Sequence, residues 1–214
     1  NGETTTMSAP IVAFYFDIRS PYSYLAREEV LTLGEKFAVA VEPLPYALAM
    51  EAFGTPESRS PRDMRKLKYI YADVRRSAKD RELIIRSPSK VFDPHLAHAA
   101  FLYARRVRRE RTLYDRLLPA FWNRAFDIEN MDQITALLGD IGANPDGFQD
   151  YLGGAANQEL GGIANDAESA GVFGVPTFVF QGELFWGADR VEVLKRHLET
   201  AGLARADTPG APIS

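Results

Sequence analysis

Strand-forming segments near opposite ends of the chain limit its possible folds more than any other feature. Residues 11–16 form an apolar run that leads through a turn at Ser20 into a helical pattern. Two further strand candidates, residues 177–180 and 184–186, lie near the other end of the 214-residue chain. The short link between them contains Gly182 and predicts a hairpin. A sheet that holds all these strands requires the residues between them to fold as an insertion.

The segments beside these strands complete a pattern typical of an α/β fold. Residues 22–33 have apolar side chains near helical spacing and end before Gly34, a common helix stop. Residues 37–41 are another strand candidate, and residues 188–201 carry the apolar face of a last helix. The order is therefore strand, helix, strand at the start, and strand, strand, helix at the end.

The stretch between these two parts is predicted to be helical and nearly without strands. We expect an α/β fold in which residues 10–60 and 163–203 form one discontinuous domain, with residues 61–162 inserted as an all-helical domain. The helices predicted in the insertion are residues 62–76, 94–109, 112–126, 131–141 and 146–160.

Composition narrows the function classes. A net charge of −4 gives no general reason to expect nucleic acid or an anionic membrane as partner. No apolar run reaches the roughly 18 residues that span a bilayer, and no secretory signal is evident, so a cytoplasmic enzyme is expected. Cysteine is absent, which excludes a disulfide framework and a thiol nucleophile of the protein's own. Sulfur chemistry would need a bound thiol.

Both ends are set aside from the fold. Met7 is predicted to be the native start, with residues 1–6 an addition ahead of it. Residues 204–214, which include Pro209 and Gly210, are predicted to form a flexible tail.

Ser20 lies where a strand gives way to a helix, with Pro21 fitting the first helical turn. Unpaired backbone N–H groups and the helix dipole favour negative charge at such a position. One interpretation is that Ser20 is only an N-cap, which contributes about 1 kcal/mol. The other is that its hydroxyl and the nearby amides stabilise an external anion, with a thiolate as the leading candidate.

The segment around Pro176 allows two interpretations as well. Val175-Pro176 precedes an apolar strand, where proline either starts an edge strand or sits in a cis bond at a tight turn. Further on, Gly187 permits an unusual backbone angle, and Ala188-Asp189 opens the final helix with a carboxylate. By itself, Asp189 is explained equally well as a helix-start residue or as a ligand contact.

Three segments occur in order around the helical block: Phe14-Tyr-Phe-Asp with Ser20-Pro-Tyr-Ser-Tyr-Leu, then Gly171-Val-Phe-Gly-Val-Pro-Thr-Phe, then Glu183-Leu-Phe-Trp-Gly-Ala-Asp-Arg. In this combination the chain resembles the 2-hydroxychromene-2-carboxylate isomerase and kappa-class glutathione transferase family, a branch of the disulfide-oxidoreductase-like thioredoxin superfamily. The resemblance covers the chain outside its ends. It implies a thioredoxin-like domain with a helical insertion, glutathione as cofactor and a homodimer.

The resemblance also implies roles for individual residues. Ser20 would hydrogen-bond the glutathione sulfur and keep it as thiolate, in place of the first cysteine of related oxidoreductases. Val175, before a cis-Pro176, would pair its backbone with the cysteinyl part of glutathione. Ala188 and Asp189 would hold the γ-glutamyl end. No metal is implied.

The activity implied is isomerisation of an unsaturated aromatic 2-oxo acid through transient addition of the glutathione thiolate. Tyr22 and Trp122 are candidates for packing against the substrate ring, or are core residues. A kappa-like glutathione transferase and a non-catalytic thioredoxin-fold binding protein are the alternatives.

Three positions depart from the family's usual pattern. Thr55 and His95 stand where members often carry asparagine, and Arg19 stands where leucine is more usual. Arg19 either holds a substrate carboxylate bidentately or pairs with an acid such as Asp17. His95 and His98 lie three residues apart on an expected helix, which suggests a metal site only weakly, and structural roles are favoured.

Overall fold

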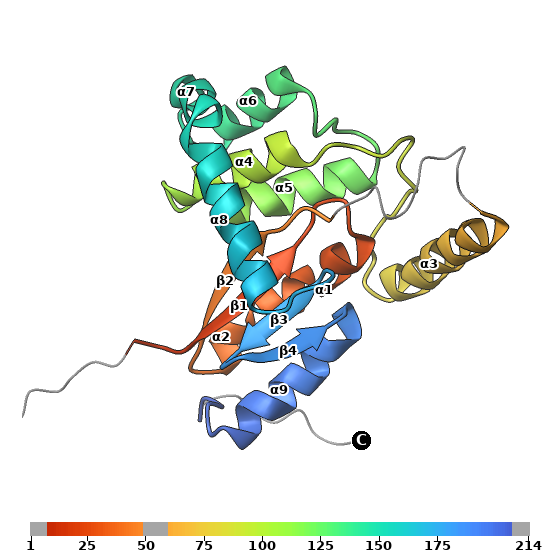
Figure 1. The fold of residues 1–214 in the computed structure, drawn as a ribbon, viewed down its shortest axis with the longest axis vertical. Helices are drawn as coiled ribbons and strands as arrows, with labels where there is room; N and C mark the ends of the chain where they lie inside the picture. Colours follow the sequence, from red (N-terminus) through yellow and green to blue (C-terminus); the bar gives the residue numbers. More distant parts are fainter. Residues whose placement is uncertain (1–7, 49–59, 207–214) are drawn as a thin grey trace, which may run out of the picture.

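The computed structural model describes residues 8–48 and 60–206. Its elements follow the order expected from the sequence, with a strand–helix–strand unit, a helical block, and then two strands and a helix (Figure 1). The α/β fold with a helical insertion is therefore confirmed. Within the described residues, no helix combines the length and apolarity needed to cross a membrane.

One mixed sheet forms the centre of the fold, with strand order β2-β1-β3-β4. β1 is parallel to β2 and antiparallel to β3, and β3 continues into β4 through the predicted hairpin. Tyr15 pairs with Thr177, so the end of β1 and the start of β3 meet at the same end of the sheet. The strands are β1 (Ile11–Phe16), β2 (Ala40–Pro45), β3 (Thr177–Phe180) and β4 (Glu183–Trp186).

Alternate side chains of β1 serve opposite faces of the sheet. Phe14 and Phe16 belong to the main core, together with the buried residues of α1 (Pro21–Leu31) and α9 (Val191–Thr200). Tyr15 instead packs in a smaller cluster that contains Ala167, near the end of α8. Helices therefore cover both faces, which is why β1 is apolar along nearly its whole length.

The helical block lies over one end of the sheet, and α8 runs from it across the sheet (Figure 1). Phe101 and Tyr114 of this block contact Phe16 of β1, with ring centroids 5.0 and 4.6 Å apart. One continuous core thus joins block and sheet. The remaining helices are α2 (Leu33–Lys36), α3 (Pro61–Lys79), α4 (His95–Arg105), α5 (Glu110–Trp122), α6 (Met131–Asp140), α7 (Phe148–Gly153) and α8 (Ala155–Ser169), with 3-10 turns η2 (Pro145–Gly147) and η3 (Ala188–Arg190).

Two predictions near the start of the chain are wrong. The second strand is β2 at Ala40–Pro45 rather than residues 37–41. β2 lies at an edge of the sheet, where a proline such as Pro43 is tolerated because one side of the backbone needs no partner. Gly34 does not stop a helix either, since it lies inside α2.

Other boundaries also differ from the predictions. α4 ends at Arg105 and α5 at Trp122, earlier than the expected 109 and 126. The helix expected at 146–160 is instead broken at Gly154 into α7 and α8. α8 continues to Ser169, across the predicted domain boundary at residues 162 and 163, so the two units share a helix.

The start of the predicted tail is held in place. Ala204 forms a β-bridge with Phe37, and the Arg205 N–H donates to the Lys36 carbonyl at 2.9 Å. The predicted tail thus begins with two residues that are paired with the end of α2 and with Phe37. The predictions for Met7, residues 1–6, Thr55 and residues 207–214 concern positions outside the described residues.

Candidate active site

Ser20 caps the first helix of the fold. Its backbone is extended, with φ −87° and ψ 115°, and its side-chain oxygen accepts a hydrogen bond from the Ser23 N–H at 3.2 Å. Ser20 is therefore the N-cap of α1. Ser20 is nearly buried, and its hydroxyl proton is donated to no other described residue. No acidic residue lies in the first turn of α1, so the positive end of the helix dipole is not neutralised there.

A buried ion pair holds the turn before Ser20. The Arg19 Nη2 lies 2.7 Å from Asp17 Oδ2, with side chains only 11% and 1% exposed. Asp17 also accepts the backbone N–H groups of Arg19 and Leu48, and its own carbonyl accepts the Ser20 N–H at 2.9 Å. These bonds from Arg19 keep the pKa of Asp17 below its ordinary value despite the opposing effect of burial. The carboxylate therefore fixes the backbone that presents Ser20.

His98 supports the same turn from the helical block. Its Nε2 is 3.3 Å from the Ile18 N and accepts that N–H, and it lies 3.8 Å from Asp17 Oδ1. Burial lowers the pKa of His98 to about 4, although the Asp17 charge acts in the opposite direction. His98 is thus neutral near pH 7, as an acceptor at Nε2 must be.

Arg19 does not have the free guanidinium that substrate binding would need. Besides Asp17, it donates to the carbonyls of Phe92 at 3.1 Å and Leu48 at 2.9 Å. Pairing with Asp17 is the arrangement observed, in a nearly buried setting rather than at the surface. A bidentate grip on a substrate carboxylate would require these bonds to break.

Val175 and Pro176 form the segment that leads into β3. Their peptide bond is cis, as the family resemblance implied. The Pro176 carbonyl accepts the Gly187 N–H at 2.9 Å, which ties the start of β3 to the end of β4. Within residues 8–48 and 60–206, neither the N–H nor the C=O of Val175 has a hydrogen-bond partner. Val175 therefore presents a free backbone donor and acceptor.

The loop after β4 places Ala188 and Asp189 around the same cavity as Val175 and Pro176. Gly187 has φ 113° and ψ 152°, a conformation essentially confined to glycine. A Cβ there would also come within 2.7 Å of Asp189 Oδ1. Asp189 is exposed and pairs with Arg190 at 2.9 Å. Glycine at 187 is thus needed for the carboxylate to occupy this position.

A cavity of about 530 Å³ brings most of the predicted contacts together. Val175, Pro176, Ala188 and Asp189 line it, as does Tyr22 from α1. Ser20 is not among its lining residues and lies at the end of the same helix, two residues before Tyr22.

The opposite wall of this first cavity comes from α3. Asp73 and Ser77 of α3 line it from that side, together with Arg81 just after the helix. The Tyr22 hydroxyl donates to Asp73 Oδ2 at 3.0 Å, and burial followed by this bond raises the pKa of Tyr22 to about 12. Tyr22 is therefore a neutral donor over the working pH range. Segments from both ends of the chain and from the insertion meet here.

Trp122 and His95 lie elsewhere. Trp122 is fully buried and stacked on Tyr24, with ring centroids 6.3 Å apart, so it is a core residue and not a substrate contact. The His95 Nε2 is 2.7 Å from Asn157 Oδ1 and, with His98, lines a separate cavity of about 340 Å³. Across the described residues, no group of three His, Asp or Glu side chains is arranged to hold a metal ion.

Several contributors to the site were not predicted from the sequence. The Asp17 carboxylate follows directly on an apolar strand, and that position was the available signal. Asp73, Ser77 and Arg81 had none, because α3 and the turn after it reach the cavity only through tertiary packing. For His98 a structural role was favoured over a metal site, and its hydrogen bond to the Ile18 N–H is such a role.

Comparison with known proteins agrees with this fold. The model of the DsbA-like thioredoxin domain matches residues 11–199. A 2-hydroxychromene-2-carboxylate isomerase of Sphingobium xenophagum is 27% identical over 190 residues, covering 87% of this chain and 97% of the relative. One of Pseudomonas putida is 26% identical, covering 86% and 92%. The resemblance inferred from the sequence motifs is thereby confirmed.

Solved structures show the same relationship. A 2-hydroxychromene-2-carboxylate isomerase superposes with a TM-score of 0.76 at 25% identity, covering 90% of this chain and 96% of that chain. A cytosolic disulfide reductase from Pseudomonas aeruginosa, solved with GSH, gives a TM-score of 0.62 at 16% identity, covering 89% and 98%. The second likeness shows the fold alone. With its family-model match over nearly the whole described sheet and helical block, the chain belongs to the DsbA-like thioredoxin domain family.

Proposed function

We propose that the protein is a glutathione-dependent cis–trans isomerase of the 2-hydroxychromene-2-carboxylate isomerase type, acting on an unsaturated aromatic 2-oxo acid. The observation that carries the proposal is the Ser20 hydroxyl at the N-terminus of α1, which donates to no other described residue and lies at the same end of the sheet as the cis Val175-Pro176 bond. Relatives named 2-hydroxychromene-2-carboxylate isomerase match over most of the chain. The chain has no cysteine with which to perform the disulfide chemistry of other thioredoxin-like proteins.

Ser20 and the first turn of α1 would stabilise the thiolate. A free thiol has a pKa near 8.5, and a helix N-terminus lowers it by one or more units. The Ser20 hydroxyl adds a charge-assisted hydrogen bond to the ionised sulfur. Asp17 is held by Arg19, so its own charge does not oppose that of the thiolate.

The polar groups that line the first cavity suit the parts of glutathione other than its sulfur. The free N–H and C=O of Val175 suit the backbone of a cysteinyl residue that adds as an extended strand. The Asp189 carboxylate suits the ammonium of a γ-glutamyl group, beside the backbone of Ala188. A volume of about 530 Å³ lies within the range of small-molecule sites.

When bound, glutathione supplies a sulfur nucleophile that adds to the substrate's double bond and later leaves, so that rotation occurs about a single bond in between. The protein's own residues orient the two molecules and keep the sulfur ionised. The neutral Tyr22 hydroxyl donates to Asp73, and both residues form part of the wall of the first cavity. The substrate would lie between the sulfur and the helical block.

Ser20→Ala tests the proposal, with Ser23→Ala as its matched control. Ser23 is buried in the same helix, and its hydroxyl has no hydrogen-bond partner among the described residues, so its removal should leave folding and turnover near wild type. Ser20→Ala should lose about 1 kcal/mol of stability as a cap. It should also raise the pKa of bound glutathione and lower turnover about 10²-fold, as loss of an anion-stabilising donor does. Thiolate absorbance against pH and a steady-state isomerase assay provide the two measurements.

The outcomes separate the candidate functions. Wild-type turnover in Ser20→Ala would refute the role of Ser20. Release of glutathione unchanged marks an isomerase, whereas its consumption would indicate a transferase on the same scaffold. Failure to bind glutathione at millimolar concentration would leave a binding protein.

A further inference from the structure

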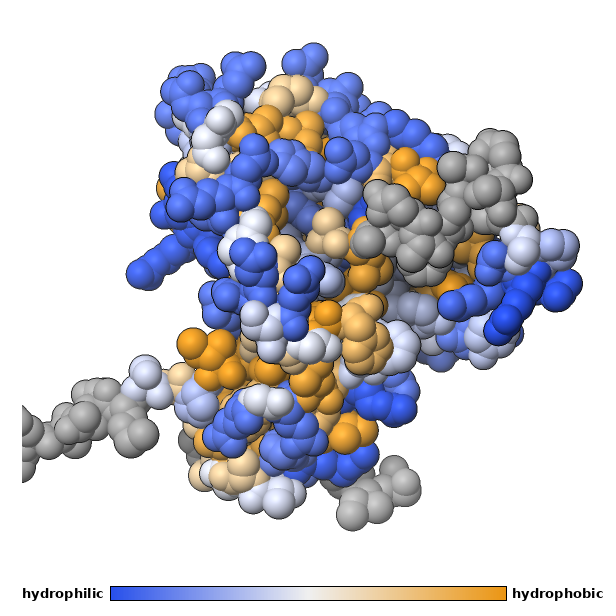
Figure 2. Space-filling view, in the orientation of Figure 1, coloured by the Kyte–Doolittle hydropathy of each residue, from blue (hydrophilic) through white to orange (hydrophobic). Residues whose placement is uncertain are grey.

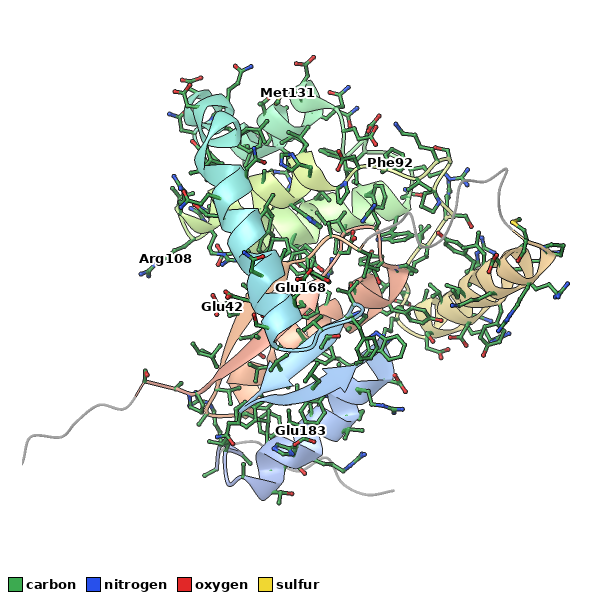
Figure 3. The ribbon with its side chains drawn as sticks, in the orientation of Figure 1. Glu42, Phe92, Arg108, Met131, Glu168 and Glu183 are labelled. Carbon is green, nitrogen blue, oxygen red and sulfur yellow. The ribbon has the colours of Figure 1, made fainter. Side chains whose placement is uncertain are left out.

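A second cavity, of about 660 Å³, is lined by Arg19, which does not line the first cavity. It is formed between α3, the segment that leads into α4, and Phe121 of α5. Phe92, which is labelled in Figure 3, meets Phe121 edge to face in this wall, with ring centroids 5.4 Å apart. Met64 and Leu67 of α3 supply apolar surface opposite. These walls suit a flat aromatic group.

The charges lining this second cavity are of one sign. Arg65, Lys68, Arg75 and Lys90 line it together with Arg19, and no Asp or Glu does so among the described residues. Arg19 and Lys90 are already paired with Asp17 and Glu129, and Arg75 donates to Ser87 Oγ at 3.1 Å. Arg65 and Lys68 have no hydrogen-bond or ion-pair partner in the part of the chain that the structure describes. Two cations are thus available to an anionic ligand.

The positions of Arg65 and Lys68 on α3 suit a ligand that carries both an aromatic ring and a carboxylate. Arg65 and Lys68 are three residues apart, so their side chains are neighbours on the helix surface. Leu67 and Tyr71 line the same cavity from adjacent positions, which places apolar surface beside the charges. A ring against Phe92 and Phe121 would leave its carboxylate within reach of two charged donors.

The second cavity adjoins the proposed thiol site. Both cavities use α3, where Asp73 lines the first and Arg75, two residues later on a different face of the helix, lines the second. Arg19, which lines the second cavity, directly precedes Ser20. A ligand held there would lie next to the N-terminus of α1.

We infer that the second cavity binds the ring and carboxylate of the organic acid substrate, with Arg65 and Lys68 as the residues that select for the carboxylate. The inference rests on the proposed function for the reaction that follows binding. Binding of the acid itself requires no glutathione. The two ideas can therefore fail separately.

The test compares two probes on the glutathione-free full-length protein. Benzylidenepyruvate is an unsaturated aromatic 2-oxo acid, and benzylideneacetone is its neutral counterpart without the carboxylate. The double variant Arg65→Ala/Lys68→Ala should raise the Kd of the acid about tenfold or more, because charged hydrogen bonds are lost. The Kd of the ketone should stay within about twofold. Lys79→Ala removes an exposed cation of the same helix outside both cavities and should leave both Kd values unchanged.

Three results would overturn the inference. They are an unchanged Kd for the acid, an equal loss for acid and ketone, and a loss of glutathione affinity in the double variant with acid binding intact. The last would assign Arg65 and Lys68 to the thiol ligand. Wild-type protein that binds the acid selectively through these cations but fails to isomerise it with glutathione would sustain the inference and refute the proposed function.

Discussion

His98 shows how one buried side chain links the helical block to the catalytic turn. It is 1% exposed and accepts the Ile18 N–H, two residues before Ser20. The charged groups around it are Asp17, Arg19, His95 and Asp93, yet burial is the largest influence and lowers its pKa to about 4. Protonation would remove the acceptor at Nε2 and place a charge in the core.

This residue predicts a pH-dependent stability. The pKa of His98 is 6.5 in the unfolded chain and about 4 in the folded one, so the unfolded state binds more protons between these values. The free energy of unfolding should therefore fall by about 3 kcal/mol as the pH drops from 6.5 to 4. His98→Gln keeps an acceptor without a titrating ring and should lose this contribution.

Urea denaturation at several pH values measures the effect. The Asp17 contribution is distinct, because its lowered pKa gives stability that is lost only as the pH falls below about 3.8, and His98→Gln retains it. Equal pH dependence in the wild type and in His98→Gln between pH 6.5 and 4 would contradict the assignment.

Site residues that lie in local motifs were predictable from the sequence, whereas contacts between distant segments were not. Val175, Pro176, Ala188 and Asp189 sit in recognisable local motifs, and all four line one cavity. The pairing of Arg19 depends on carbonyls of Leu48 and Phe92, which no local pattern relates to it. Trp122 likewise lies at a helical position whose burial is set by packing against Tyr24 of another element. Tertiary packing, not motif, decided these two.

At the scale of single elements, α8 shows why glycine signals mislead. Two glycine pairs lie near each other in the sequence. The helix is interrupted at Gly153-Gly154, whereas α8 continues through Gly161-Gly162. Glycine permits a break without requiring one. Packing of Ala156 and Ala167 at opposite ends of α8 keeps the helix continuous from the block to the sheet.

The glycines inside α8 predict a stabilising substitution. Gly161 and Gly162 are exposed, and a Cβ at either meets nothing within 4 Å. Gly161→Ala/Gly162→Ala should therefore raise the free energy of unfolding by about 1–2 kcal/mol, because alanine loses less backbone entropy in a helix. Gly142→Ala is the control, since its φ of 78° is strained for alanine and should lower stability despite equally open space. Urea midpoints that rise in neither variant, or in both, would show that backbone preference does not control stability here.

At the scale of the whole molecule, the sequence pattern separated two units that the structure joins. The predicted order of elements was correct, and the sheet is formed by strands from both ends of the chain. The block and the sheet nevertheless share one core, in which Phe16 contacts Phe101 and Tyr114. Hydrophobic periodicity identifies which face of a helix is buried but not against which partner, so this union was not predictable.

α3 contributes little to this shared core. It stands apart from the other helices in Figure 1, and much of its outer side is hydrophilic in Figure 2. Only Val74 and Ala78 of its 19 residues are buried, and a capping box at Ser60 and Asp63 fixes its start. Few buried apolar contacts mean a low free energy of local opening. Both cavities nevertheless use this helix as a wall.

Glutathione should therefore order α3 selectively. If opening of α3 dismantles the first cavity, ligand at 100 times its Kd should add up to about 2.7 kcal/mol to the opening free energy, or roughly a hundredfold slower amide exchange. Hydrogen exchange by mass spectrometry should show this over residues 61–79 and not over α4 or α5, which are closed by core packing. Tyr22→Phe removes the bond to Asp73 and should speed α3 exchange without ligand. Unchanged α3 exchange in protein saturated with glutathione would mean that the thiol site lies wholly on the sheet side, with no contribution from α3.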